Sequence, residues 1–182
     1  MTELEFELEF KKRKLQKRKQ RRMELLILGV HLGVVIVLLY WMFGIGMVHG
    51  RSMRPAYRDG DLFLYQRRLF GEPDYGDVVV IHRQNLERDI VKRIAGKPGD
   101  VIDLDGLGHL TRNGERVSET EILFGEQEND DWITFPYTVP EGNYFCLGDN
   151  RPRSEDSRVL GAFSRQEITG KVLAQLRLSA AK

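Results

Sequence analysis

The segment DIVKRIAGKPGD, residues 89–100, predicts a β-strand that ends in a tight turn. Alternate side chains of a strand lie on the same face, so Lys92 shares a face with Ile90 and Ile94. Burial on such an apolar face lowers the pKa of a lysine, and a neutral amine is a usable general base near neutral pH. The alternative is a lysine that extends its ammonium group to water. The rest of the chain decides between the two, because a general base needs a nucleophile beside it.

The sequence on both sides of this segment predicts a mostly β domain over residues 49–182. Gly60-Asp61 and Pro98-Gly99 are turn signals between short apolar runs. Asn113-Gly114 predicts a type I′ hairpin turn within residues 110–117, because Asn and Gly accept positive φ angles. The acidic stretch 119–131 is predicted to be a surface loop. The predicted strands are residues 62–65, 77–82, 90–94, 101–104, 144–147 and 172–178.

An uncharged stretch, residues 25–48, is long enough to cross a membrane as a helix. At about 1.5 Å per residue it reaches about 36 Å, more than the roughly 30 Å of a hydrocarbon core. Residues 1–22 carry nine Lys and Arg against four Glu, and such a basic flank stays in the cytoplasm. A cleavable signal peptide is the alternative, but its apolar core spans only about 7–15 residues and ends at a site of the Ala-x-Ala type, which is missing here. The predicted organisation is a cytoplasmic basic segment at 1–22, a transmembrane helix at 23–48 and an extracytoplasmic β-rich domain at 49–182.

The cysteine and histidine content argues against a disulfide and against a metal site. The single cysteine, Cys146, lies in an apolar run and is predicted to fill space in the core rather than to act as a nucleophile. His49, His82 and His109 are scattered and lack the spacing of zinc ligands. We therefore expect neither a metal nor another cofactor.

Three motifs along the chain combine residue types that suit proteolysis by a serine and a lysine. The first is SMRP, residues 52–55, and the second is the segment that contains Lys92. The third is GDNRPRSEDSR, residues 148–158, which places charged and hydroxyl side chains directly after an apolar strand. Together these motifs resemble the bacterial type I signal peptidases, the membrane-anchored Ser/Lys proteases of family S26, in a Gram-positive-like form. The resemblance implies a mostly β fold, a signal-peptidase-type catalytic domain preceded by one transmembrane α-helix.

The resemblance also implies a role for each polar residue of the motifs. Ser52 is expected to be the nucleophile and Lys92 its general base, with the backbone N–H of Ser52 as an oxyanion donor. Ser154 is expected to hydrogen-bond and orient the Lys92 amine, because a carboxylate in its place would keep that amine protonated. The expected supporting residues are Asp156 and Arg158, which would pair and hold the loop of Ser154, and Asp149 and Arg151, which would brace the site without touching substrate.

The expected substrates are the signal peptides of secreted preproteins, with small residues at positions −1 and −3 before the cut. The peptide would be added as an extended strand, and Met53, Ile90 and Ile94 are predicted to form the walls of its side-chain pockets. Ser52 follows the predicted span by four residues, which keeps it near the membrane surface where cleavage sites emerge. The lipid bilayer is the other expected partner. Nucleic acid is not expected, since the basic run adjoins a membrane span and suits anionic lipid.

Two other functions are compatible with the sequence. A histidine-based protease would use Ser52 with His82 or His49 and an aspartate, although no carboxylate partner of His82 is evident. A catalytically idle relative would serve as a pilus or surface-protein assembly factor, but such relatives have lost catalytic residues, whereas Ser52 and Lys92 are both present here. A serine endopeptidase with a Ser/Lys dyad is therefore the function that the sequence favours.

Overall fold

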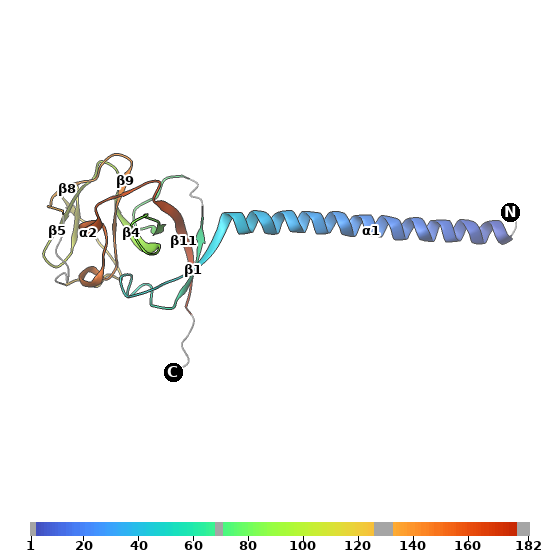
Figure 1. The fold of residues 1–182 in the computed structure, drawn as a ribbon, viewed down its shortest axis with the longest axis horizontal. Helices are drawn as coiled ribbons and strands as arrows, with labels where there is room; N and C mark the ends of the chain where they lie inside the picture. Colours follow the sequence, from blue (N-terminus) through green and yellow to red (C-terminus); the bar gives the residue numbers. More distant parts are fainter. Residues whose placement is uncertain (1–2, 68–70, 126–132, 178–182) are drawn as a thin grey trace, which may run out of the picture. The chain divides into compact units, whose positions relative to one another are not determined.

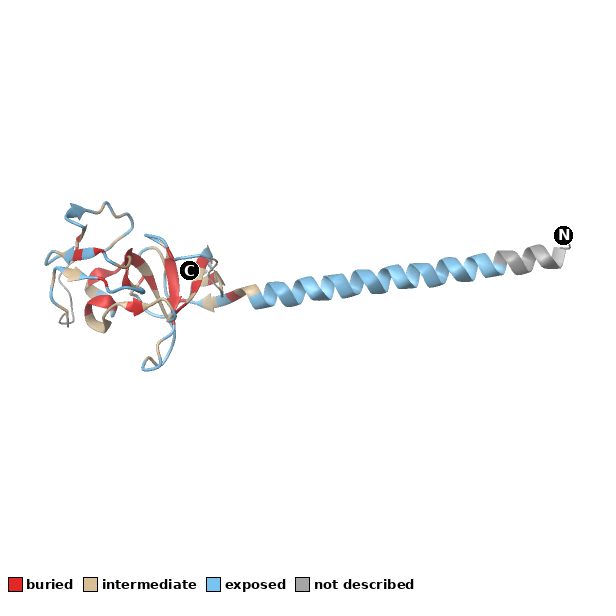
Figure 2. Cartoon of the chain, turned by 90° about the horizontal axis from the view of Figure 1, so that it is seen from above, coloured by how far each residue is buried: buried red, intermediate tan, exposed pale blue. Residues whose placement is uncertain are grey.

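The computed structural model describes residues 3–67, 71–125 and 133–177, with side chains from residue 11 onward. The chain divides into two compact units, Met1–Trp41 and Met42–Lys182. The first unit is one long helix, α1 (Glu3–Met42), whose described side chains are exposed (Figure 2). Its part Lys11–Met42 is long and apolar enough to cross a membrane, by length and composition. The second unit contains the strands and the candidate site.

The predicted membrane span is wrong at its C-terminal end. Helix α1 ends at Met42, and strand β1 (Phe43–Met47) follows at once. Strand β1 pairs antiparallel with β2 (Leu62–Gln66), and Val48 is buried in the domain core. The uncharged part of the helix is therefore residues 25–42, about 27 Å long, and residues 43–48 belong to the β domain.

Two glycines explain why β1 forms a strand in the sheet. A Cβ atom at Gly44 would lie 2.5 Å from Cζ of Tyr65, and one at Gly46 would lie 2.3 Å from Cζ of Phe63. Both distances are far below van der Waals contact, so only glycine allows β1 to lie this close to the two rings of β2. The lack of charge that suggested a membrane helix reflects this packing instead.

The larger sheet of the domain has seven strands in the order β1-β2-β11-β3-β4-β9-β10. The last strand of the chain, β11, lies between β2 and β3, so the sheet joins early and late parts of the sequence (Figure 1). The bounds are β3 (Val78–Ile81), β4 (Ile90–Gly96), β9 (Asn143–Leu147), β10 (Phe163–Ser164) and β11 (Ile168–Leu176).

The smaller sheet has four strands in the order β7-β6-β5-β8 and lies at the end of the domain away from β1 and β11 (Figure 1). The predicted hairpin is confirmed, since β6 and β7 pair antiparallel around Asn113 and Gly114, whose φ angles are 54° and 83°. The bounds are β5 (Val101–Leu104), β6 (Leu110–Arg112), β7 (Glu115–Arg116) and β8 (Tyr137–Thr138).

The mostly β prediction for the domain is confirmed, and every predicted strand has a counterpart. The final strand starts earlier than predicted, and residue 178 at its predicted end lies outside the described residues. Of the predicted acidic loop, residues 126–131 also lie outside them. The elements that were not predicted are short: β1, β8, β10, the 3₁₀ turn η1 (Arg151–Arg153) and the helical turn α2 (Ser157–Leu160).

Strand β3 is buried on both faces and separates two apolar clusters. Val79 and Ile81 pack on one face in a cluster with Ile94, which β4 contributes. The register pairs Val79 with Lys92, and directly opposed residues of an antiparallel pair share a face. The prediction that Lys92 points to the apolar side with Ile94 is therefore confirmed.

Candidate active site

Ser52 and Lys92 come together although they are 40 positions apart in the sequence. The Nζ atom of Lys92 lies 2.9 Å from Oγ of Ser52 and 3.2 Å from the carbonyl oxygen of Val91. Lys92 is only 3% exposed, whereas Ser52 is half-buried and can be reached from solvent. A buried amine thus lies beside an accessible hydroxyl.

The loop between β1 and β2 carries Ser52, and hydrogen bonds fix it from two sides. The N–H of Gly50 donates to Oδ1 of Asp59 at 2.8 Å. The N–H of Asn150 donates to the carbonyl oxygen of Ser52 at 2.9 Å, and its Nδ2 donates to the carbonyl oxygen of Arg51 at 3.0 Å. The N–H of Ser52 itself donates to none of the described residues, so it is available to a substrate oxygen.

Gly148 allows the third motif to approach Ser52 closely. A Cβ atom at Gly148 would lie 2.6 Å from the carbonyl oxygen of Ser52 and 2.2 Å from Oγ of Ser154. Any side chain at this position would displace the backbone of the candidate nucleophile. The N–H of Gly148 donates to Oδ2 of Asp156 at 2.9 Å, which holds the glycine in place.

The surroundings of Lys92 favour its neutral form. Burial is the largest influence and lowers the pKa of Lys92; the negative charge of Asp156 acts in the opposite direction without cancelling it. The alternation of β4 explains the burial, because it directs Lys92 toward the apolar cluster of Ile94 and Cys146. A lysine with a lowered pKa has a larger neutral fraction near neutral pH, and the neutral amine has a lone pair that accepts a proton.

The expected pair of Asp156 and Arg158 is present and buried. Arg158 donates from Nε to Oδ1 of Asp156 at 2.8 Å and from Nη2 to Oδ2 at 2.9 Å. Burial raises the pKa of Asp156, but the hydrogen bonds from Arg158 and from the Gly148 N–H outweigh it, so the net pKa is lowered. Nη2 of Arg158 also donates to the carbonyl oxygen of Arg151 at 2.8 Å, which ties the two ends of the loop together.

The expected hydrogen bond from Ser154 to Lys92 is not observed. Ser154 is fully buried, and its Oγ has no hydrogen-bond partner among the described residues. The hydroxyl lies against Gly148. The amine of Lys92 hydrogen-bonds the carbonyl oxygen of Val91 instead. The orienting contact that was assigned to Ser154 is thus made by the backbone of β4.

Asp149 and Arg151 each pair with a residue that was not predicted. Asp149 accepts hydrogen bonds from Nε and Nη2 of Arg93 at 2.8 and 2.6 Å. Arg151 pairs with Oε1 of Glu119 at 2.5 Å. The alternation of side chains along β4 could have indicated Arg93 from the sequence, because it directs Arg93 to the face opposite Lys92. Glu119 carried no such signal, since it belongs to an acidic stretch with no periodic pattern.

A small cavity of about 80 Å³ opens beside Ser52 and Lys92, between the end of β1 and the start of β4. Met53 and Ile90, two of the three residues predicted to bind substrate, line this cavity. The third, Ile94, does not line it, because it is 2% exposed within the core cluster. Val91, which was not predicted, also lines the cavity.

Among the described residues, the hydroxyl of Ser52 hydrogen-bonds Lys92 and neither His49 nor His82. Nδ1 of His82 lies 2.8 Å from Oδ1 of Asp89, so His82 does have a carboxylate partner, contrary to expectation. Both side chains are more than half exposed, and His82 does not line the cavity. His49 does line it, but the hydroxyl of Ser52 is bonded to Lys92. Cys146 is fully buried in the core, as predicted, and burial raises the pKa of its thiol.

A serine hydroxyl beside a buried amine, in a mostly β domain that follows an apolar helix, fits the class of serine hydrolases. Comparison with known proteins agrees with this class. The family model for signal peptidase, peptidase S26, matches residues 21–176. The chain therefore belongs to the signal peptidase family S26.

Individual relatives are similar over most of their length. Signal peptidase I of Bacillus licheniformis is 36% identical over 153 residues, which cover 78% of this chain and 82% of the relative. Signal peptidase I S of Bacillus subtilis is 34% identical with the same coverage, and signal peptidase I of Streptococcus pneumoniae is 30% identical over 72% of this chain and 79% of its own. A solved signal peptidase I from Enterococcus faecalis aligns with 57% of this chain and 98% of its own at 30% identity, with a TM-score of 0.45.

Proposed function

We propose that this chain removes signal peptides from exported proteins at the outer surface of the cell membrane, with Ser52 as nucleophile and Lys92 as general base. Membership of the family makes the chain a signal peptidase, and the residues that perform the reaction are our inference. The single observation that supports them best is the distance of 2.9 Å between Nζ of the buried Lys92 and Oγ of Ser52. It is within the hydrogen-bond reach that a general base requires.

The reaction follows from this geometry in two steps. Neutral Lys92 takes the hydroxyl proton of Ser52 while Oγ attacks the carbonyl carbon of the scissile bond, and the N–H of Ser52 stabilises the developing oxyanion. The C–N bond then breaks, and the ammonium of Lys92 gives its proton to the leaving amine. A water molecule next attacks the acyl-enzyme, with Lys92 again as base, and the signal peptide leaves with a free carboxylate as Ser52 recovers its proton.

The cavity beside the dyad supports a preference for small residues before the cut. Its volume of about 80 Å³ is well below the roughly 300 Å³ of a pocket for a larger ligand. Met53, Ile90 and Val91 give this small cavity apolar walls that suit a methyl-sized side chain, and the charged residues Arg88 and Asp89 also line it. We infer that a substrate lies extended along the edge formed by the end of β1 and the start of β4, with its small residues in this cavity.

The basic segment before the apolar helix supports a defined orientation in the membrane. Nine Lys and Arg residues precede residue 23, and such a basic flank supports an N-terminus in the cytoplasm with the β domain outside. Preproteins emerge on that outer side with their signal peptides still in the membrane, so an anchored protease meets them there.

Cleavage by purified full-length protein in detergent tests the dyad. The substrate is a preprotein with an Ala-x-Ala site, and the variants are Ser52→Ala and Lys92→Ala. We expect either change to lower kcat by more than about 1,000-fold, because the two residues act as one unit. His82→Ala is the control, and it should stay within about twofold of the wild-type rate because His82 lies outside the cavity.

Three outcomes would contradict the proposal. Retained activity of Ser52→Ala would remove the nucleophile, and a loss of activity in His82→Ala alone would restore the histidine-based reading. A wild-type protein that binds but never cleaves the preprotein would indicate an idle assembly factor.

A further inference from the structure

One segment, residues 119–125, contacts both loops of the candidate active site, and we name it the strap. Ile122 forms an antiparallel bridge with Pro55, three residues after Ser52. Leu123 forms a parallel bridge with Asn150 in the loop of the third motif. The strap therefore connects the loop of the nucleophile to the loop that contacts the nucleophile from the other side.

The bridge at Leu123 fixes the residue that holds Ser52. The N–H of Leu123 donates to the carbonyl oxygen of Asp149 at 2.8 Å, and its carbonyl oxygen accepts from the N–H of Arg151 at 2.9 Å. These two bonds bracket Asn150, whose own N–H donates to the carbonyl oxygen of Ser52. A displacement of the strap would thus move Asn150, and Asn150 would move the backbone of Ser52 to which it is bonded.

Glu119 locks the strap through a buried ion pair. Its Oε1 accepts from Nη2 of Arg151 at 2.5 Å, and the side chains of Glu119 and Arg151 are 11% and 2% exposed. Arg151 also donates from Nε to the carbonyl oxygen of Gly148 at 3.1 Å, and Gly148 packs against Ser52 and Ser154. The ion pair therefore joins the start of the strap to the glycine that touches the nucleophile.

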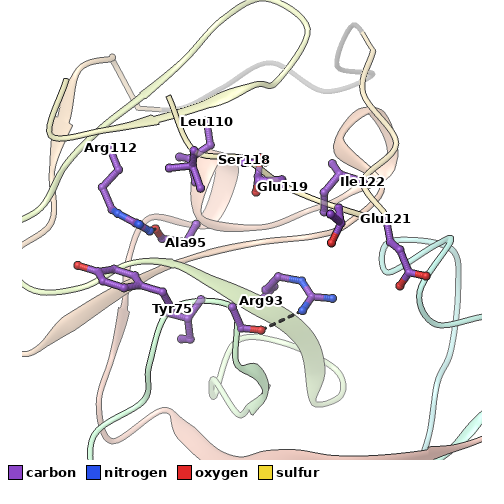
Figure 3. A pocket seen from close by; sticks show the side chains of 13 residues that line it. Tyr75, Arg93, Ala95, Leu110, Arg112, Ser118, Glu119, Glu121 and Ile122 are labelled. Carbon is purple, nitrogen blue, oxygen red and sulfur yellow. Dashed lines mark hydrogen bonds between the residues drawn. The ribbon is translucent and has the colours of Figure 1, made fainter. Parts of the chain in front are cut away.

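The strap is not held by close packing on β4. A cavity of about 320 Å³ lies between strap residues, including Glu119 and Ile122, and the residues Arg93 and Ala95 of β4 (Figure 3). Figure 3 shows Arg93 below this space, with its guanidinium bonded to the carbonyl oxygen of Gly76. The strap is therefore held by its two bridges, its ion pair and the Phe124 ring, whose centroid lies 4.3 Å from that of the His109 ring, rather than by packing on β4.

We propose that the strap positions Ser52 against Lys92, and that Glu119 is the positioning residue that fixes the strap by its ion pair with Arg151. Glu119 does not touch the dyad, so it acts only through Arg151, Gly148 and Asn150. This inference rests on the proposed roles of Ser52 and Lys92.

Glu119→Gln tests the lock, with Glu121→Gln as the matched control. Both changes remove one negative charge from the strap, but Glu121 is exposed and lies two residues further along. We expect Glu119→Gln to lower kcat about 10- to 100-fold with KM within about twofold, since a displacement near 1 Å costs this much. Glu121→Gln should keep kcat within about twofold.

The pH dependence of kcat separates positioning from electrostatics and from a loss of fold. The charges that act on Lys92 include Asp156, Glu155 and Asp149, but Glu119 is not among the main ones. The midpoint of the pH profile of Glu119→Gln should therefore match that of the wild type while the plateau is lower. Thermal unfolding measured in parallel ensures that kcat is compared at a temperature where both proteins are folded.

Leu123→Pro gives a second test that leaves the ion pair intact. Proline lacks the N–H that donates to Asp149, whereas Leu123→Ala keeps it and removes only a side chain that is 43% exposed. We expect Leu123→Pro to lower kcat at least tenfold and Leu123→Ala to have little effect. Wild-type activity in Glu119→Gln and Leu123→Pro would overturn the inference while the dyad stands. A wild-type protein without cleavage, or an active Ser52→Ala, would overturn the dyad and this inference with it.

Discussion

The protonation state of Lys92 depends on its burial and on the charge of Asp156. Asp156 is the charge that most favours the protonated amine, and it is itself charged because its pKa is lowered. Both of its oxygens, however, accept hydrogen bonds from Arg158. Burial remains the dominant influence on Lys92, so its pKa is lowered despite the charge of Asp156. The pair of Asp156 and Arg158 thus holds its loop in place while the pKa of Lys92 stays lowered.

The rate of cleavage should rise with pH and then level off. Below the pKa of Lys92 the amine is protonated and cannot accept the proton of Ser52, so the neutral fraction and the rate increase together as pH rises. Because burial lowers this pKa, the midpoint should lie below the value of about 10.4 that is usual for lysine. The measurement is kcat/KM for the preprotein from pH 5 to 10, with the folded fraction checked at each pH.

A rate that is flat over this range, or that falls as the pH rises, would contradict a neutral lysine as base. The same series on Lys92→Ala measures the background hydrolysis, which should show no such rise.

Candidate site residues that lie within short sequence motifs could be named from the sequence, whereas their contact partners far away in the sequence could not. The roles of Ser52, Lys92 and the pair of Asp156 and Arg158 were expected from the family resemblance that their short motifs carry. Asn150 and Glu119 act through contacts across about one hundred and about thirty residues, and no local pattern reports such contacts. The bond expected between Ser154 and Lys92 is not observed, and the amine bonds the carbonyl oxygen of Val91.

Strand β1 is the element whose local sequence points to the wrong structure. Residues 43–48 are uncharged like the helix before them, so hydropathy extends the helix through them. Their glycines face the rings of Phe63 and Tyr65, and this tertiary contact decides for a strand. Strands β4 and β6 were predictable, by contrast, because alternation and an Asn-Gly turn define them within a few residues.

Replacement of Gly46 by alanine should destabilise this edge of the sheet. A Cβ atom there would lie 2.3 Å from the Phe63 ring, and that ring is buried in the core. Such overpacking costs about 1–3 kcal/mol, which lowers Tm by roughly 4–12 °C in a domain of this size. Thermal unfolding in detergent measures the shift.

Gly33→Ala serves as the control for this experiment, because nothing lies within 4 Å of a Cβ atom at that position of α1. Equal Tm values for Gly46→Ala and the wild type would show that β1 does not pack on β2 in solution.

For the molecule as a whole, the proposed orientation predicts which ends are accessible from outside the cell. We expect a cysteine at Arg116→Cys, an exposed position of β7, to react with a membrane-impermeant maleimide in intact cells. A cysteine at Lys12→Cys should react only after the membrane is broken. The wild type supplies the background, because Cys146 is buried and its thiol pKa is raised. Labelling of Lys12→Cys in intact cells would reverse the orientation.

The place of β11 in the middle of the larger sheet has a consequence for biosynthesis. A nascent chain that has reached the third motif already carries Ser52, Lys92 and their supporting loop, yet β2 and β3 still lack the strand that joins them. Completion of the larger sheet therefore has to wait for β11, which is synthesised after both candidate catalytic residues.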